Sequence, residues 1–245
     1  MFQTPGDETP LWRYTDMAKF VSLLSSRSLF FARADKLGDP FEGSLPRATR
    51  RDFVAWMRTL ERPATAPPIE GTIASFMDHL RHMTRYTLIN SWFRAEHESD
   101  AMWRLYGGAT GVAVHTTVGS LKNSLGTDRS VYIGSISYVD YDTAVIPMGN
   151  AFWPYLHKRL AFQHEQEVRA VVVEFPPSVG DRFDYSVDVC EVGTRVPVDL
   201  GVLVAGIAVA PYAHDWFHEV VQDLVTHYDL DVEVRKSDIG QPPEW

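Results

Sequence analysis

Apolar residues recur every three or four positions in several segments of the chain, which is the spacing of one face of an α-helix. The apolar sets are Met17, Phe20, Val21 and Leu24; Phe53, Trp56, Met57 and Leu60; Ile73, Phe76, Met77 and Leu80; and Phe217, Val220, Val221, Leu224 and Val225. Thr15 or Asp16 can cap the first of these helices. Shorter helices are predicted at residues 99–106, with Ser99 as the cap, at 118–125 and at 152–160.

Other segments are rich in β-branched and aromatic residues and are bounded by turn residues, a pattern typical of strands. Strands are predicted at residues 11–14, 28–32, 87–93, 111–115, 131–139, 168–175, 185–192, 205–210 and 230–235. The segment 168–175 is apolar almost throughout, which is typical of a central strand that is buried on both faces.

The predicted helices fall mainly in the N-terminal half, the strands fall mainly in the second half, and the two do not alternate regularly. This order favours an α+β fold, with helices packed on a bent antiparallel or mixed sheet, over a doubly wound fold. We expect one globular domain over residues 1–245, with loose termini at 1–10 and 238–245. The proline-rich segment 62–68 joins two predicted helices, so we interpret it as an internal loop.

Charge and composition narrow the class of protein. The formal net charge is −9, which argues against bulk nucleic-acid binding because that needs a basic field around the phosphates. A run of arginines, Arg47, Arg50, Arg51, Arg58 and Arg62, is expected to be a solvated helix face. No apolar run approaches the roughly 20 residues that span a bilayer, and residues 1–10 do not resemble a secretory signal. With a single cysteine, Cys190, these features predict a cytoplasmic protein without disulfides.

Familiar catalytic motifs are absent from the sequence. It has no phosphate-binding loop, no dinucleotide fingerprint, no nucleophile elbow and no His-Glu-x-x-His. His157 and His164 have no third residue at a recognisable ligand spacing, so no metal site is predicted. We interpret Cys190 as a packing residue rather than a nucleophile.

The densest polar cluster precedes the central strand. If that strand begins near Glu165, then Glu165, Glu167 and Arg169 project from one face, because strand side chains alternate. Two carboxylates and an arginine in this arrangement can hold a ribose hydroxyl or a developing cation. A solvated strand edge with one ion pair explains the same residues equally well.

Two aromatic segments offer further candidates. Ser91 and Trp92 lie at the end of a predicted strand, where such residues are more often core than site. Arg13 lies beside Tyr14 in the first predicted strand, where its fork of donors could grip a phosphate from inside a cleft. The residues Asp39-Pro40-Phe41-Glu42 are accounted for by a turn.

Together, these segments resemble a bacterial family described as domain of unknown function 2971. The shared features are Arg13-Tyr14, Asp39-Pro40-Phe41-Glu42, Ser91-Trp92-Phe93, Met102-Trp103-x-x-Tyr106, Gly111-Val112 and a lysine followed by Phe162-x-x-Glu165-x-Glu167-x-Arg169. The match runs from about residue 11 to Ser237, and the combination is more specific than any single piece. Since members of the family are mostly without assigned activity, the resemblance alone implies no reaction.

A more distant resemblance is to the ADP-ribosyltransferases of the Arg–Ser–Glu type. Arg13, Ser91 and the pair Glu165 and Glu167 occur in the order of that family's motifs, although Trp92 departs from its Ser-Thr-Ser segment. The resemblance implies an ADP-ribosyltransferase-like fold and NAD as co-substrate, with no metal.

The same resemblance implies a role for each residue. Glu167 would hold the ribose hydroxyls and stabilise a developing oxocarbenium ion, and Glu165 would orient or deprotonate the acceptor. Arg13 would bind the pyrophosphate, and Ser91 would contact the ribose or support Glu167. Tyr14, Trp92 or Tyr106 would stack on the nicotinamide.

Two alternatives stay open. The same cleft could hold NAD or a similar nucleotide-like ligand in a non-catalytic binding or sensing module. A hydrolase or nuclease of another type would require a divalent metal. The acceptor of an ADP-ribosyltransferase is not indicated by the sequence.

Overall fold

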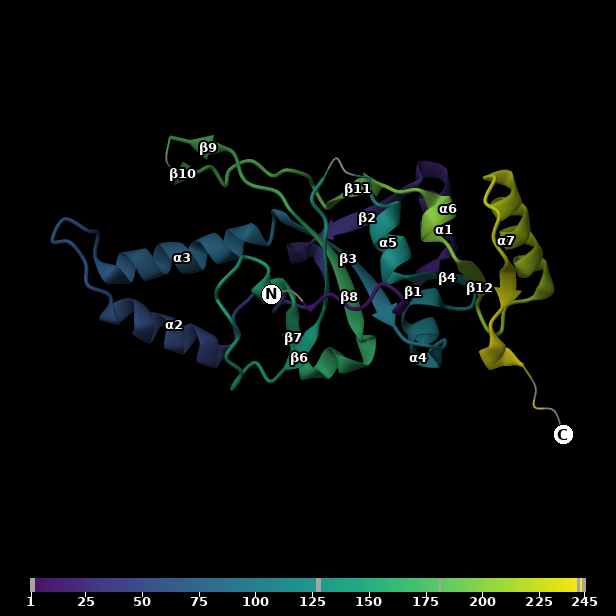
Figure 1. The fold of residues 1–245 in the computed structure, drawn as a ribbon, viewed down its shortest axis with the longest axis horizontal. Helices are drawn as coiled ribbons and strands as arrows, with labels where there is room; N and C mark the ends of the chain where they lie inside the picture. The colour runs from purple at the N-terminus through teal and green to yellow at the C-terminus, as the bar shows by residue number, and fades with distance from the viewer. Residues whose placement is uncertain (1–2, 127–128, 181, 242, 244–245) are drawn as a thin grey trace.

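The computed structural model of the chain describes residues 3–126, 129–180, 182–241 and 243. It is a mixed α/β fold built on one mixed sheet (Figure 1). The strands of this sheet are β1 (Pro10–Asp16), β2 (Ser28–Arg33), β3 (Thr87–Arg94), β4 (Gly111–Thr117), β5 (Tyr132–Ser135), β8 (Glu167–Val173), β11 (Gly193–Pro197), β12 (Gly206–Val209) and β13 (Val234–Lys236). Among the described strand pairs of this sheet only β12 and β13 run parallel.

The predicted helices form because their apolar faces pack on this sheet or on each other. The helices are α1 (Met17–Ser26), α2 (Arg47–Thr59), α3 (Ile69–Met83), α4 (Asp100–Met102), α5 (Val118–Ser124), α6 (Leu200–Leu203) and α7 (Asp215–His227). Asp16 caps α1 by accepting from the Lys19 amide, and Ser99 caps α4, both as predicted. The main core buries the apolar faces of α1, α5 and α7 against sheet residues such as Leu88, Val112 and Val168.

The sheet divides at β3, and this division creates the space for a site. One edge of β3 pairs with β8 from Thr87 to Phe93. The other edge is shared, because β2 pairs with Leu88 and Ile89 whereas β1 pairs with Phe93 and Arg94. Between the two partners, β3 continues through residues 90–92 without a strand neighbour on that edge among the described residues. We call this opening the fork.

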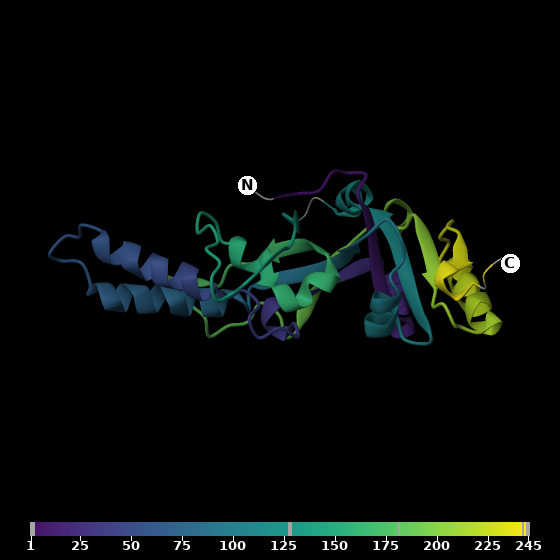
Figure 2. The same ribbon diagram turned by 90° about the horizontal axis from the view of Figure 1, so that it is seen from below.

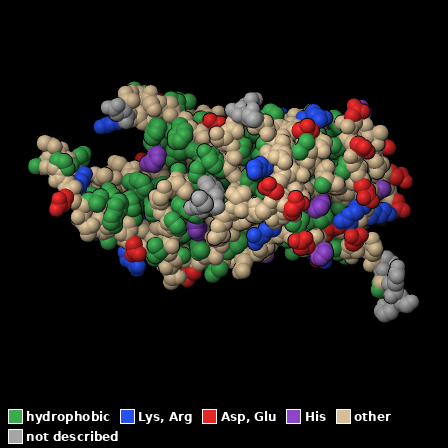
Figure 3. Space-filling model, in the orientation of Figure 1, with side chains coloured by type: hydrophobic (Ala, Val, Ile, Leu, Met, Phe, Trp, Pro, Cys, Tyr) green, Lys and Arg blue, Asp and Glu red, His purple; other side chains and the backbone are tan. Residues whose placement is uncertain are grey.

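An arm made of α2 and α3 projects from one end of the sheet (Figures 1 and 2). Only two residues of α2, Ala48 and Thr49, are buried. The arginines of α2 are mostly paired with acids, for example Arg58 with Glu70 at 3.0 Å. Figure 3 shows apolar side chains gathered over the arm and the neighbouring hairpin of β9 (Ser178–Val179) and β10 (Arg182–Phe183).

The prediction of a helix at 152–160 is wrong. The chain forms a 3₁₀ turn, η3 (Trp153–Tyr155), followed by strand β7 (His157–Arg159). β7 pairs in parallel with β6 (Ser137–Val139), so a long-range pairing overrides the local helical pattern. The predicted strand 131–139 is accordingly split between β5 and β6, which pair with different partners.

The strand does not begin as early as Glu165, which was the condition for both glutamates to project from one strand face. Residues up to that position form a 3₁₀ helix, η4 (Leu160–Glu165). Gln166 then adopts a left-handed conformation with φ 40° and ends η4 before β8 begins at Glu167. The two glutamates therefore reach the same site from a 3₁₀ helix and a strand rather than from one strand face.

The predicted strand at 185–192 is a series of turns instead. Arg85 holds this loop by donating to Asp188 and to the Tyr185 carbonyl oxygen, and Arg33 donates to the Cys190 carbonyl oxygen at 2.8 Å. These charge-assisted bonds satisfy the backbone without a ladder. Cys190 is a half-buried free thiol.

The ends of the chain differ from the predicted loose termini where they are described. The Gln3 carbonyl oxygen accepts from Ser135, Thr4 donates to Ile133, and the Asp7 carbonyl oxygen accepts from Gly119. At the other end a 3₁₀ turn, η5 (Asp238–Gly240), follows β13, and residues 242, 244 and 245 lie outside the described part. Of the helices described, none is long and apolar enough to cross a membrane.

Candidate active site

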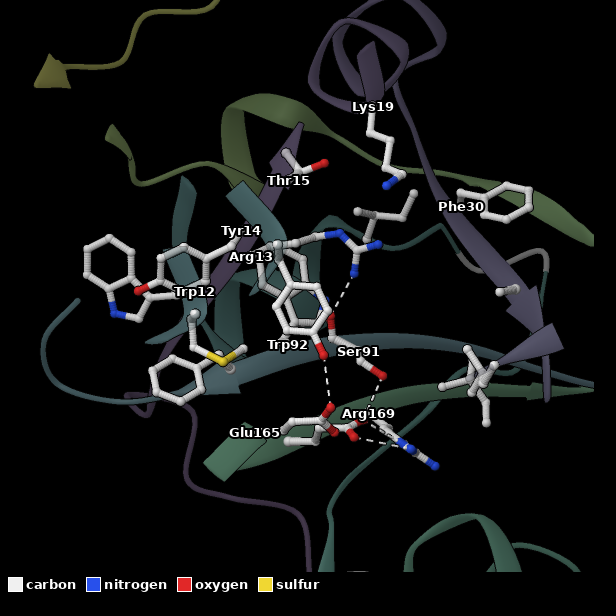
Figure 4. A pocket seen from close by; sticks show the side chains of 18 of the residues that line it. Trp12, Arg13, Tyr14, Thr15, Lys19, Phe30, Ser91, Trp92, Glu165 and Arg169 are labelled. Carbon is white, nitrogen blue, oxygen red and sulfur yellow. Dashed lines mark hydrogen bonds and ion pairs between the residues drawn. The ribbon is translucent and has the colours of Figure 1, made fainter. Parts of the chain in front are cut away.

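A cavity of about 750 Å³ opens at the fork. Its walls come from β1, β2, β3 and β8, from the first turns of α1, from the turn at 37–42 and from the segment 158–165. Figure 4 shows side chains from these elements, Arg13, Ser91 and Glu165 among them, pointing toward the same space. The fork thus gathers residues from distant parts of the sequence around one pocket.

Arg13 forms the cationic wall of this pocket. It extends from β1 and donates from Nη1 to the Ser91 carbonyl oxygen at 2.7 Å, within the fork. Its guanidinium lies 5.7 Å from the centroid of the Trp92 ring. No carboxylate of the described residues pairs with it, and burial lowers the pKa of Arg13 to about 10. Arg13 is therefore a charged group at neutral pH without a counter-ion from the described protein.

Ser91 connects this cation to the acidic wall. β3 and β8 are in register so that Ser91 lies opposite Arg169 and Phe93 lies opposite Glu167. The Ser91 hydroxyl donates to Glu167 Oε2 at 2.8 Å, while its carbonyl oxygen accepts from Arg13. Arg13, Ser91 and Glu167 form a continuous chain of contacts along one edge of the pocket.

Glu167 is a buried carboxylate held by several donors. Arg169 Nε donates to Oε2 at 2.7 Å and Lys158 Nζ donates to Oε1 at 2.6 Å. Burial by itself would raise the pKa of Glu167, but Arg169, a hydrogen bond with Glu165 and Lys158 together hold it well below its usual range. Glu167 is therefore charged at neutral pH.

Glu165 lies next to Glu167 at the end of η4. Its Oε1 accepts from the Tyr106 hydroxyl at 2.8 Å, and its Oε2 pairs with the Lys158 ammonium. Burial and the hydrogen bond with Glu167 raise the pKa of Glu165, and Lys158 partly opposes that rise. Two adjacent carboxylates with pKa values shifted in opposite directions are typical of a site where one stays charged and the other exchanges protons.

Arg169 carries the network to a third carboxylate. Its Nη1 and Nη2 donate to the two oxygens of Glu42 at 2.5 and 2.9 Å, so the turn at 37–42 is fastened to β8. In their ionised forms, Glu42, Glu165 and Glu167 face Lys158 and Arg169, which leaves a net charge of −1. The pocket is thus cationic at Arg13 and slightly anionic at the glutamates.

The three aromatic residues predicted to stack on a ligand are placed differently from one another. Trp92 is only 1% exposed and packs in the main core, where its Nε1 donates to Asn90. Tyr14 is 8% exposed and its hydroxyl accepts from the Ser99 amide. Tyr106 is 46% exposed and lines the pocket, so it is the one of the three with an open ring.

The sequence-based interpretation missed Lys158, Glu42 and Lys19 as members of the site. The wrong helix prediction for its segment hid Lys158, although a lysine before the two glutamates was among the features of the resemblance. Glu42 was interpreted as a turn residue, and its partner lies 127 residues away. Lys19 lines the pocket mouth beside Arg13 (Figure 4) and pairs with Asp16 at 2.8 Å.

The two histidines of the polar cluster lie apart from these contacts. His157 Nδ1 contacts the Trp153 carbonyl oxygen at 2.7 Å, and His164 is exposed. No group of three or more metal-binding side chains occurs within the described ranges.

Comparisons with known proteins give a distant likeness to solved structures. No family model matches the sequence, and no curated protein does. A solved structure of Thermus sp. 2.9 DarT in complex with ADP-ribosylated ssDNA is similar over 97% of each chain, with 9% identity and a TM-score of 0.40. A likeness this distant assigns neither a family nor a reaction, so the case for a function rests on the pocket itself.

Proposed function

We propose that this protein is an NAD-dependent ADP-ribosyltransferase-like enzyme that cleaves the nicotinamide–ribose bond and transfers ADP-ribose to an acceptor. The observation that carries the proposal is the contact chain from Arg13 through Ser91 to Glu167 along one pocket. Arg13, which has no carboxylate partner among the described residues, lies on one side of Ser91, and the charged Glu167 lies on the other. This arrangement suits a ligand that has an anionic part and a part that becomes cationic.

Arg13 supplies the anion-binding end. Most of its donors are unused by the described protein, and a guanidinium fork matches two phosphate oxygens. Lys19, on the first turns of α1, places a second ammonium donor at the same mouth, next to its partner Asp16. The diphosphate of NAD fits this end.

Glu167 supplies the cation-stabilising end. When the bond between the ribose C1′ and the nicotinamide nitrogen breaks, its electron pair moves to the ring nitrogen and positive charge develops on the ribose. A fixed carboxylate in a cleft shielded from water stabilises that charge more strongly than water does. The low pKa of Glu167 keeps it charged for this purpose.

Glu165 and Tyr106 complete the reaction site. The acceptor attacks C1′ and gives its proton to Glu165, whose raised pKa suits a general base better than that of an ordinary exposed carboxylate. Tyr106 lies beside Glu165 and offers an open ring against which the nicotinamide can stack.

Release of free nicotinamide from NAD by the purified protein tests the proposal, with and without cell extract as a source of acceptors. In Glu167→Gln, release should fall by about a hundredfold or more, while NAD binding stays within about threefold. Glu174→Gln, one residue beyond the far end of β8 and paired with Arg129, is the matched control and should not change release. No release by the wild type under either condition would refute the proposal.

One observation favours a second candidate, a non-catalytic module that binds a nucleotide-like ligand. Both oxygens of Glu167 already accept from protein donors, namely Ser91, Lys158 and Arg169. A carboxylate with this many protein donors can have a purely structural role. NAD binding that depends on Arg13, without nicotinamide release, would support this candidate.

A further inference from the structure

Lys158 occupies an unusual place in the pocket. It extends from β7 and is only 8% exposed, and its ammonium contacts both Glu165 and Glu167. The Phe162 ring lies 4.5 Å from the same nitrogen. Burying an ammonium is costly unless its hydrogen-bonding groups are paired, and here the two glutamates provide that pairing.

The position of Lys158 is set by the elements around it. β7 is held by its parallel pairing with β6. The next residue, Arg159, pairs with Asp39 at 2.6 Å and lies 4.3 Å from the Phe41 ring. The backbone on either side of the ammonium is therefore anchored, and the cation is a fixed part of the site.

Lys158 is the charged partner on which Glu165 depends. Arg169 divides its donors between Glu42 and Glu167. The salt bridges of the described residues give Glu165 a single cation, Lys158. Without it, Glu165 would face the negative charge of Glu167 inside a buried pocket, and a proton would be the only remaining way to neutralise it.

We propose that Lys158 is a positioning residue whose ammonium, placed between the two glutamates, keeps Glu165 charged and aimed into the pocket at neutral pH. The consequence for catalysis rests on the proposed function, because only there does Glu165 act as the base. The electrostatic part of the inference stands on the geometry alone.

The other groups that face Glu165 cannot replace this charge. Tyr106, from the π-helix η2 (Trp103–Gly107) that follows α4, donates a neutral hydrogen bond, because burial raises the pKa of its hydroxyl. Tyr138, from β6, accepts from the Glu167 amide and stays neutral for the same reason. From β8, Glu167 adds negative charge, and Arg169 donates to Glu167 and Glu42. Removing Lys158 should therefore raise the pH at which Glu165 gains its proton.

Carboxyl-carbon NMR of protein labelled in its glutamate side chains measures this directly, with Glu165→Gln used to assign the signal. In Lys158→Met and Lys158→Gln the Glu165 midpoint should rise by about one pH unit or more. Lys158→Arg, which keeps the charge, should move it by less than about half a unit. An unchanged midpoint in both neutral variants, with the fold intact by circular dichroism, would overturn the inference. If one neutral variant fails to fold, the other serves.

The pH profile of nicotinamide release separates this inference from the proposed function. The acidic limb of the kcat/KM profile should move to higher pH in Lys158→Met and return in Lys158→Arg. Lys122→Met, which changes an exposed side chain of α5, should match the wild type. Release with an unmoved limb would overturn the role of Lys158 alone. A moved NMR midpoint in a protein that releases no nicotinamide would uphold the electrostatic role and refute the enzyme.

Discussion

At the scale of single residues, Arg13 and Glu167 differ in how the protein treats their charges. Glu167 is neutralised by Arg169 and Lys158, at 2.7 and 2.6 Å. Among the described residues, Arg13 has a carbonyl oxygen at 2.7 Å and the Trp92 ring, but no carboxylate. A folded protein rarely leaves a sheltered guanidinium without a counter-ion. A ligand that brings its own negative charge removes that cost, and this makes Arg13 the residue on which binding should depend most.

Arg13→Met should weaken NAD binding by about tenfold to a hundredfold, since it removes charge-assisted hydrogen bonds to the diphosphate. Isothermal titration calorimetry with NAD measures the effect. Arg50→Met, on the exposed face of α2, is the matched control because it removes an arginine outside the pocket. Equal affinity for Arg13→Met and the wild type would mean that the diphosphate binds elsewhere.

The pairing of Glu167 also predicts a dependence of stability on pH. The pKa of Glu167 in the folded protein lies below its ordinary value of 4.5. The contribution of Glu167 to the free energy of unfolding is therefore fully present above pH 4.5 and is lost as the pH falls toward the folded-state pKa. The free energy of unfolding of the wild type should exceed that of Glu167→Gln near neutral pH, and the difference should shrink below about pH 4.5. Urea unfolding across this range checks it, and a constant difference would contradict the account.

At the scale of elements, local sequence patterns predicted most of the helices correctly, but they did not predict the structure of the segments around the site. The apolar spacing and the cap at Asp16 predicted α1 correctly. In contrast, the segment that carries Lys158 forms β7 because it pairs with β6, which no local pattern reveals. The Glu165 to Arg169 cluster was recognised as a possible site, but its geometry depends on the left-handed turn at Gln166.

The contact between the 37–42 turn and β8 is one such long-range feature. Glu42→Ala should lower the free energy of unfolding by about 3 kcal/mol, because it leaves a buried guanidinium with one carboxylate fewer. Urea unfolding at neutral pH measures this. Glu61→Ala, in the exposed α2–α3 loop, should change it by less than about 0.5 kcal/mol. A small effect at Glu42 would mean that water replaces the lost partner.

At the scale of the whole molecule, the sequence correctly indicated a mixed α/β fold with a mixed sheet, but it could not indicate the fork. The fork exists because β1 and β2 share one edge of β3, and strand order is not encoded in hydrophobic periodicity. The arm is a similar case. Its two helices were predicted from their apolar spacing, but their projection from the end of the sheet, seen in Figure 2, could not be predicted.

The arm should be dispensable for both folding and NAD binding. The pocket takes none of its lining residues from 43–88, and Phe53 and Phe76 lie 4.6 Å apart between ring centroids, which marks a place to join the two helices. Replacing residues 54–75 with a linker of about four glycine and serine residues should shift Tm by less than about 5 °C. NAD affinity should stay within about threefold. A large loss of affinity would place part of the binding site on the arm.

The fork should hold a dinucleotide with its diphosphate at Arg13 and its nicotinamide ribose at Glu167. A crystal structure of Glu167→Gln with NAD tests this arrangement, because the variant should bind without turnover. We expect phosphate oxygens within hydrogen-bond distance of Arg13, the ribose beside residue 167 and the nicotinamide against Tyr106. NAD bound outside the fork, or with its adenosine at residue 167, would contradict it.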